Sequence, residues 1–433
     1  MLSIRRLKEI SKDELEGILN RGQMELESVL ERVAGILKDV KEKKDLCLLE
    51  MLRDVNPKAE IKDLVVHEEE FEEAFALIGK EVKAAIQKAM ENIKRFHEAQ
   101  VERAFWADEI RDGMLLGRMN RPLERVGCYI PGGRAPYPST VLMTVIPAKV
   151  AGVSEIYLTT PVGADLKVNP TILVAAKMAG ATKVFKVGGP WGIGAFAYGT
   201  ETVPKVYKIV GPGNKYVTAA KLLVYGKVDI DSPAGPSEGL ILADETARPD
   251  FVAWDLISQL EHDPDASALL VTTSMELAQQ VSSFLEKLVL GQPKRDVIME
   301  AMAKNCHIIV SENMDQALSF VNDYAPEHLE IHCKIPFEVL FKIKNAGSIF
   351  LGDYAPIAVG DYASGTNHVL PTGGAAKVFS GLSVDSFIKS TTFQHLSKGG
   401  LEEIKNAILT LSKVEGLEAH GGSVLVRLEG KTD

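Results

Sequence analysis

Apolar positions in the first hundred residues recur at three- or four-residue spacing, which is the spacing of one helix face. Ser11 and Glu14 form a capping-box pattern at the start of this region. The clearest stripe is interpreted as a core-facing face and comprises Phe71, Phe75, Ile78, Val82, Ile86, Met90 and Ile93. The pattern predicts a helical region.

Beyond Arg121 the pattern changes to short β-rich runs that end in glycine or proline turns. The predicted strands are Arg125–Ile130, Glu155–Thr160, Val184–Val187 and Val206–Val210. Helical patterns at Thr171–Ala179 and Tyr216–Leu223 separate them, which favours parallel strands with right-handed crossovers. Ligands are then expected at the carboxyl ends of the strands.

A second strand series follows, with amphipathic stretches such as Phe251–Gln259 between its strands. These strands are Leu240–Ala243, Leu269–Thr272, His307–Val310 and Ser348–Leu351. From about Phe387 the pattern is helical, and it closes with an alternating run at Ser423–Leu428, which predicts a strand. The predicted fold is therefore α/β, with two Rossmann-like domains and small helical terminal domains.

The predicted domains combine these patterns. They are an N-terminal helical segment, 1–24; an α/β domain, 25–122 plus 238–385; a second α/β domain, 123–237; and a small C-terminal domain, 386–433.

Composition narrows the function. The 433 residues carry a net charge of -10, which gives no basic surface for nucleic acid. No stretch of about 18 apolar residues occurs anywhere in the sequence, and no apolar signal region follows the basic residues at the N-terminus. We therefore expect no membrane association and a cytoplasmic location. The cysteines lack CxxC spacing and are predicted to be buried, unpaired side chains: Cys47, Cys128, Cys306 and Cys333.

Gln259 and His262 lie three residues apart at the end of a predicted helix, so both could reach one metal ion. Two ligands do not complete a catalytic zinc site, which takes about three from the protein. A hydrogen-bonded helix end is the alternative. Other acid and histidine pairs are Glu327 with His328, Asp361 with His368, and Glu415 with His420; solvated loops and turn networks are the alternatives for the first two pairs.

Two glycine turns follow predicted strands, Gly188–Gly194 and Gly211–Asn214. Glycine allows close backbone approach to a phosphate or ribose. Neither turn matches the GxGxxG dinucleotide pattern, so plain strand-to-helix turns are an equal alternative.

Seven strings, in order from about Arg121 to His420, resemble the histidinol dehydrogenase family. They are VGCYIPGGRAPYPSTVLM, KIVGPGNKYVTAAK, DSPAGPSEGL, SQLEHDPD, YAPEHLE, GDYASGTNHVLPTGGAA and VEGLEAH. The resemblance implies aldehyde-dehydrogenase-like α/β domains and a cytoplasmic homodimer of histidine biosynthesis. It also implies oxidation of L-histidinol, through L-histidinal, to L-histidine, with zinc and two NAD.

The resemblance also implies residue roles. The zinc ligands would be Gln259, His262, Asp361 and His420, which would also contact the substrate. Glu327 and His328 would be the acid/base pair, with His328 as general base and Glu327 activating water. Ser237, His368 and Glu415 would hold the substrate, which His328 would also contact, with Glu415 and His420 acting across the dimer interface. Most metal and catalytic residues would then lie in the domain of 25–122 plus 238–385, and 123–237 would be an NAD-binding-like domain. NAD would contact Tyr129, Asn214 and the glycine loop around Trp191.

The chain departs from the family pattern at two positions. The family usually has glutamine in the glycine loop where this chain has Trp191, and an indole cannot offer the same acceptor. The family also commonly has a glutamate where this chain has Ile357. A paralogous dehydrogenase of another small polar alcohol, an inactive zinc-binding homologue and a metal-assisted hydrolase are the competing hypotheses.

Overall fold

The computed structural model describes residues 3–21, 27–132, 135–232 and 235–429. The chain forms two compact units, one of Met1–Gln100 with Glu124–Phe387 and one of Val101–Leu123 with Ile388–Asp433. Residues 22–24 of the expected first segment, and residues 133–134 and 233–234 within two of the family-like strings, lie outside the described residues.

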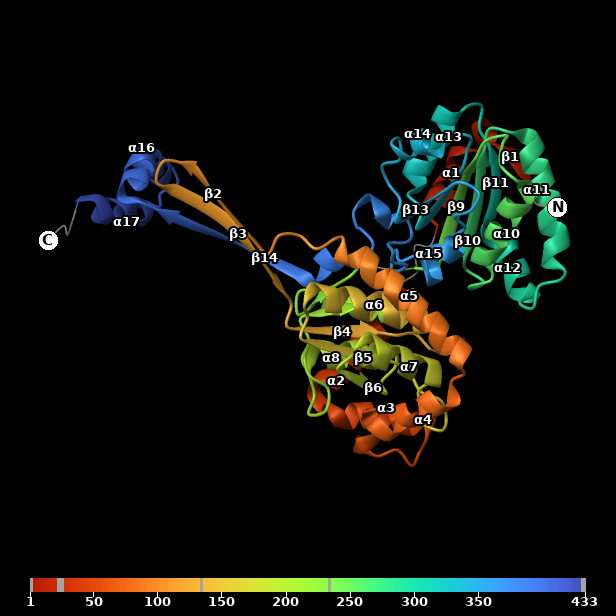
Figure 1. Cartoon of the computed structure of the whole chain (residues 1–433), viewed down its shortest axis with the longest axis horizontal. Helices are drawn as coiled ribbons and strands as arrows, with labels where there is room; N and C mark the ends of the chain where they lie inside the picture. The colour runs from red at the N-terminus through yellow and green to blue at the C-terminus, as the bar shows by residue number, and fades with distance from the viewer. Residues whose placement is uncertain (1–2, 22–26, 133–134, 233–234, 430–433) are drawn as a thin grey trace. The chain divides into compact units, whose positions relative to one another are not determined.

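The first unit contains a six-stranded parallel sheet with helices on both faces (Figure 1). In spatial order its strands are β1 (Ile4–Arg6), β11 (Cys306–Val310), β10 (Ser267–Thr272), β9 (Glu238–Ala243), β12 (His328–His332) and β13 (Ser348–Leu351). One face packs against α10 (Pro249–Leu260), α11 (Met275–Val289) and α12 (Arg295–Asn305). The other packs against α1 (Lys12–Leu19), α13 (Met314–Tyr324) and α14 (Pro336–Leu340). The strand order reverses between β9 and β12, as in doubly wound sheets.

A five-stranded parallel sheet forms the other half of this unit. Its strands, in spatial order, are β6 (Lys183–Phe185), β5 (Glu155–Thr159), β4 (Arg125–Tyr129), β7 (Lys208–Val210) and β8 (Asp229–Ile230). The crossover helices are α6 (Pro138–Ala151), α7 (Pro170–Ala179), α8 (Gly189–Tyr198) and α9 (Lys215–Val224). Here the order reverses between β4 and β7. The predicted α/β class, with two Rossmann-like sheets, is confirmed.

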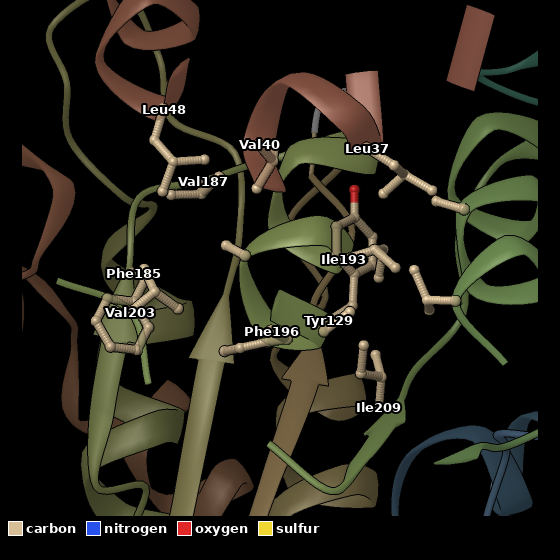
Figure 2. Close-up of a cluster of buried hydrophobic side chains, with 14 of the residues drawn as sticks. Leu37, Val40, Leu48, Tyr129, Phe185, Val187, Ile193, Phe196, Val203 and Ile209 are labelled. Atoms are coloured by element: carbon tan, nitrogen blue, oxygen red, sulfur yellow. The ribbon is translucent and has the colours of Figure 1, made fainter. Parts of the chain in front are cut away.

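Helices α2 (Glu27–Lys43) and α3 (Asp45–Val55) pack on the five-stranded sheet. Figure 2 shows Leu37, Val40 and Leu48 of these helices facing Phe185 and Phe196 of the sheet and of α8. This packing differs from the expected grouping of residues 25–122 with 238–385, because an apolar helix face does not specify which sheet it covers. The bounds of the domains stay a prediction.

The apolar stripe from Phe71 to Ile93 spans two helices, α4 (Glu68–Leu77) and α5 (Lys80–Glu98), separated at Gly79. Ile86 and Ile93 are buried, whereas Val82 is exposed. The helices contact α6 and α7 on the five-stranded sheet. The capping box of Ser11 and Glu14 is present at the start of α1, as predicted.

The second unit has a three-stranded antiparallel sheet and two packed helices. Its strands are β2 (Phe105–Arg111), β3 (Met114–Pro122) and β14 (Ile388–Leu396), with β3 in the centre, and its helices are α16 (Lys398–Val414) and α17 (Glu418–Glu429). The predicted strand at Ser423–Leu428 is wrong, since these residues lie in α17. The expected helix after Phe387 is preceded by strand β14. Pairing and packing between distant segments outweigh the local pattern here.

No helix in the described part of the chain is long and apolar enough to cross a membrane.

Candidate functional site

Glu327 and His328 lie at the amino end of β12, where the order of the six-stranded sheet reverses. His328 pairs with Gly239 of β9 and Ser348 of β13. Both side chains are buried, so the solvated-loop alternative is wrong for this pair.

A buried carboxylate holds Glu327 in place. The Glu238 N–H donates to Glu327 Oε2 at 2.9 Å, and the Glu327 N–H donates to Glu238 Oε1 at 3.2 Å. Arg21 pairs with both oxygens of Glu238, with Nε and Nη2 donating at 2.8 Å each. The Arg21 guanidinium also stacks on the ring of Tyr324. The salt bridge therefore satisfies the buried charge beside Glu327.

His328 joins two carboxyl groups. Its Nδ1 lies 3.6 Å from Glu327 Oε2 and its Nε2 lies 3.6 Å from Asp361 Oδ1. Burial alone would lower the pKa of His328, but the two carboxylates outweigh it and raise the pKa to about 9. Burial raises the pKa of Glu327 to about 8, against the opposing effect of His328. Asp361 keeps a pKa below its ordinary value, since the nearby histidines outweigh its burial.

Asp361 lies on the short helix α15 (Ile357–Tyr362). His368 follows in an irregular segment. Its Nδ1 lies 2.9 Å from the Asp361 carbonyl oxygen and its Nε2 lies 3.3 Å from Thr140 Oγ1. Burial lowers the pKa of His368. The structure thus brings His328, Asp361 and His368 together, and Thr140 is a neighbour that the sequence did not indicate.

Gln259 lies in the last turn of α10, beside Gly239 of β9 and hence beside the strand pair of His328. The Gln259 side chain is buried, and its Oε1 has no hydrogen-bond partner. A buried acceptor without a partner is costly, and a cation can satisfy it. His262 follows the helix end and is exposed, and Ser237 directly precedes β9.

Glu415 and His420 belong to the second unit, where both are exposed. Glu415 ends α16, and its N–H donates to the Leu411 carbonyl oxygen at 2.9 Å. His420 lies in the first turn of α17. Neither side chain is engaged in the core of this unit, so both are available as ligands or substrate contacts.

Three residues expected near NAD follow strand ends of the five-stranded sheet. Tyr129, labelled in Figure 2, ends β4, where the strand order reverses. Its hydroxyl accepts the Gly189 N–H at 3.2 Å. Asn214 caps α9, its side chain accepting the N–H groups of Tyr216 and Val217. Trp191 lies in the first turn of α8 and packs against the core of this sheet. The carboxyl edge is where a dinucleotide binds in such sheets.

Replacing Trp191 by glutamine is expected to lower the free energy of unfolding by about 1–2 kcal/mol, because part of a core-packed indole is lost. Urea denaturation measures this change. Trp254→Gln is the matched control, since that ring is 48% exposed and its loss is expected to cost under about 0.5 kcal/mol. Equal effects of the two substitutions would contradict the packing role of Trp191.

Sequence reasoning missed a second acid and histidine cluster, formed by Asp255, Glu330 and His332. It also missed the pair of Arg21 and Glu238, which lie 217 residues apart. No local pattern marks such contacts. The sequence holds one indication of the cluster, which is the alternation of Glu330 and His332 with apolar residues along β12. This alternation places both side chains on the face of His328.

Comparisons with known proteins identify the family of this chain. The histidinol dehydrogenase family profile matches residues 19–428. Histidinol dehydrogenase of Methanocaldococcus jannaschii is 49% identical over 98% of this chain and 99% of its own length. Histidinol dehydrogenase of Methanosarcina mazei is 49% identical over 99% of this chain and 98% of its own length. The crystal structure of histidinol dehydrogenase from Elizabethkingia anophelis superposes with a TM-score of 0.93 at 41% identity, covering 99% of this chain and 97% of that one. The chain therefore belongs to the histidinol dehydrogenase family, a family of NAD-dependent oxidoreductases.

Proposed function

We propose that this chain oxidises L-histidinol to L-histidine in two successive steps, each of which reduces one NAD, with one zinc ion in the site. The buried group of Glu327, His328 and Asp361 carries the proposal, because His328 Nε2 has no hydrogen-bond partner. An acid, a base and an unpartnered imidazole nitrogen in one buried place are the groups that proton transfer needs.

Gln259, His262 and Asp361 of the first unit are proposed to hold zinc together with His420. The donor set of one amide, one carboxylate and two imidazoles fits this metal, and the unpartnered Oε1 of Gln259 supports it. In the proposed homodimer, the second unit of the partner subunit supplies His420. Bound zinc would orient the polar groups of the substrate and polarise them to some extent.

Ser237, His368 and Glu415 are proposed to hold the amino and imidazole groups of the substrate. A carboxylate at Glu415 suits a cationic amino alcohol, and the partner subunit would supply it in the dimer. A site for an anionic substrate would place a cation there instead, which favours histidinol over the other small alcohols of a paralogous enzyme.

In the first oxidation, His328 accepts the hydroxyl proton while a hydride leaves the same carbon. Tyr129, Trp191 and Asn214 would hold NAD, which would supply the acceptor for that hydride. When the His328 ring is deprotonated, its Nδ1–H can donate to the Glu238 carbonyl oxygen at 3.3 Å, and the lone pair then lies on Nε2. The products of this step are the aldehyde, NADH and a proton on His328.

In the second oxidation, Glu327 takes a proton from the water that adds to the aldehyde carbon, and His328 gives the proton it gained in the first step to the aldehyde oxygen. The resulting hydrate then loses a hydride to a second NAD and a proton to His328, which gives the carboxylic acid. Glu327 suits this role because the Glu238 N–H and the Arg21–Glu238 pair fix its carboxyl group beside His328. The carboxyl groups of Glu327 and Glu238 are both buried, which keeps bulk water away from the reacting carbon.

Glu327→Gln is expected to slow the second oxidation by about 10²-fold while the first is largely retained, because the amide keeps the Glu238 contact and cannot accept a proton. Single-turnover NADH yield per histidinol, with trapping of the aldehyde, measures both steps. Glu312→Gln, at an exposed ion pair with Lys8, is the control and leaves both steps unchanged. Equal slowing of both oxidations would oppose the assigned role.

We also propose that the protein works in the cytoplasm, as a soluble biosynthetic enzyme without a nucleic-acid partner. Three of the four cysteines are buried, Cys333 is partly buried, and all four are unpaired, as expected from the sequence. Unpaired thiols are typical of a reducing compartment.

A further inference from the structure

A second buried polar cluster lies outside the proposed reaction site. It consists of Asp255, Glu330 and His332, whose potential ligand atoms all lie within 4.8 Å of one another. Glu330 is fully buried and His332 is 2% exposed. Glu330 Oε2 lies 3.1 Å from His332 Nε2, and Asp353 Oδ1 lies 3.6 Å from His332 Nδ1. Polar groups are retained in such a place only where their contacts offset the loss of hydration.

Each member of this cluster belongs to an element that carries a residue of the proposed site. Asp255 lies four residues before Gln259, one turn earlier on α10. Glu330 lies two residues after His328 on β12, on the same face of the strand. The cluster therefore joins the helix of one proposed zinc ligand to the strand of the proposed base.

Glu330 also contacts the helix of a second proposed ligand. Its Oε1 accepts the N–H of Ile357, the first residue of α15, at 2.7 Å. The N-cap residue of that helix is Pro356, which makes no side-chain cap. Glu330 thus supplies the acceptor that the helix start lacks. Asp361 follows Ile357 by four residues, one turn along the same helix.

Packing and protonation support this arrangement. The Ile357 side chain is buried and lies next to Gly239, where Gln259 also packs. Burial, followed by the neighbouring Glu330, raises the pKa of Asp255 to about 8. A protonated Asp255 can donate to Glu330, which leaves one net negative charge for His332 to balance.

We propose that Glu330, held by Asp255 and His332, is a positioning residue that fixes the start of α15 and thereby the place of Asp361 relative to Gln259 and His328. The inference rests on the proposed zinc site for its effect on catalysis. The claim that Glu330 holds the start of α15 in place does not depend on zinc and can be tested in the metal-free protein.

The test compares Glu330→Met, which removes the acceptor, with Glu330→Gln, which keeps an oxygen for the Ile357 N–H. In the zinc-free protein, amide hydrogen exchange over residues 357–364 is expected to rise at least tenfold in Glu330→Met and to stay within about threefold of the unsubstituted protein in Glu330→Gln. Exchange in α11 should not change. Unchanged exchange over 357–364 in Glu330→Met would overturn the proposal, whatever the enzyme does.

Zinc affinity, measured by competition with a chromogenic chelator, gives the second readout. Outer partners of metal ligands typically contribute about 10–100-fold in affinity, so Glu330→Met is expected to bind zinc that much more weakly and Glu330→Gln to restore most of the loss. Val281→Ala, in the buried face of α11, is the control for lost stability alone and should keep the affinity.

Two zinc ions per subunit, with one lost in Glu330→Met, would overturn the proposal, because the cluster would then itself be a metal site. Failure of the proposed function gives a different pattern. The unsubstituted protein would then bind no zinc or fail to oxidise histidinol, while the exchange difference between the two variants would persist.

Discussion

His328→Asn lowers kcat for L-histidinol oxidation by about 10²–10⁴-fold, which is the usual contribution of a positioned general base. Asparagine can keep a polar contact near Glu238 but cannot accept the hydroxyl proton. The loss should fall on kcat more than on KM, because the proton moves only in the reacting complex. Initial rates of NADH formation at saturating histidinol measure the effect.

His307→Asn is the matched control. His307 lies on β11 of the same sheet, where its Nδ1 contacts Arg5 at 2.8 Å. Its replacement leaves kcat within about threefold, since no proposed reaction step uses it. An active His328→Asn enzyme with unchanged kcat would show that another group removes the hydroxyl proton.

Arg21→Leu lowers the free energy of unfolding by about 3–5 kcal/mol, the cost of leaving one member of a buried ion pair without its partner. Glu238 is 2% exposed and receives two guanidinium hydrogen bonds. Without Arg21, its charge would be buried with only backbone donors. Urea denaturation of the zinc-free protein measures the loss without a contribution from metal binding.

The double variant Arg21→Leu with Glu238→Leu separates the effect of the ion pair on stability from its effect on activity. It is expected to recover part of the stability, because no unpaired charge remains. Activity should stay low, since Glu327 has lost the carboxylate that accepts its N–H. A cost below about 1 kcal/mol for Arg21→Leu alone would contradict the role given to this pair.

Most strands of the two parallel sheets could be predicted from the sequence, because they are apolar runs. Strands β1, β8 and β12 were missed, since β1 and β8 are only two or three residues long and β12 alternates polar with apolar residues. Helix α7 could also be predicted, with Asn169 as its side-chain cap and Gly180 in the left-handed conformation after its end. Strands β2, β3 and β14 could not be found in this way. Strand β2 is exposed along its whole length and carries little apolar alternation, and the pairing of β3 with β14 joins segments more than 260 residues apart.

The candidate site was predictable where local strings carry it, as at Glu327, His328 and Asp361. The residues that hold the site in place could not be predicted. Arg21 contacts a residue distant in the sequence, and Glu330 contacts a backbone N–H. Ile357 shows the difference. The sequence indicates only that an acidic group is missing there, whereas the structure places the Glu330 carboxylate 2.7 Å from the Ile357 nitrogen.

The most direct test of the central claim is the yield of NADH per L-histidinol from the zinc-loaded protein, repeated after chelation and after zinc is restored. Two NADH per histidinol are expected, with activity lost on chelation and regained with zinc. No NADH from a protein shown to hold zinc, or an equal rate after complete chelation, would contradict the proposed zinc-dependent oxidation.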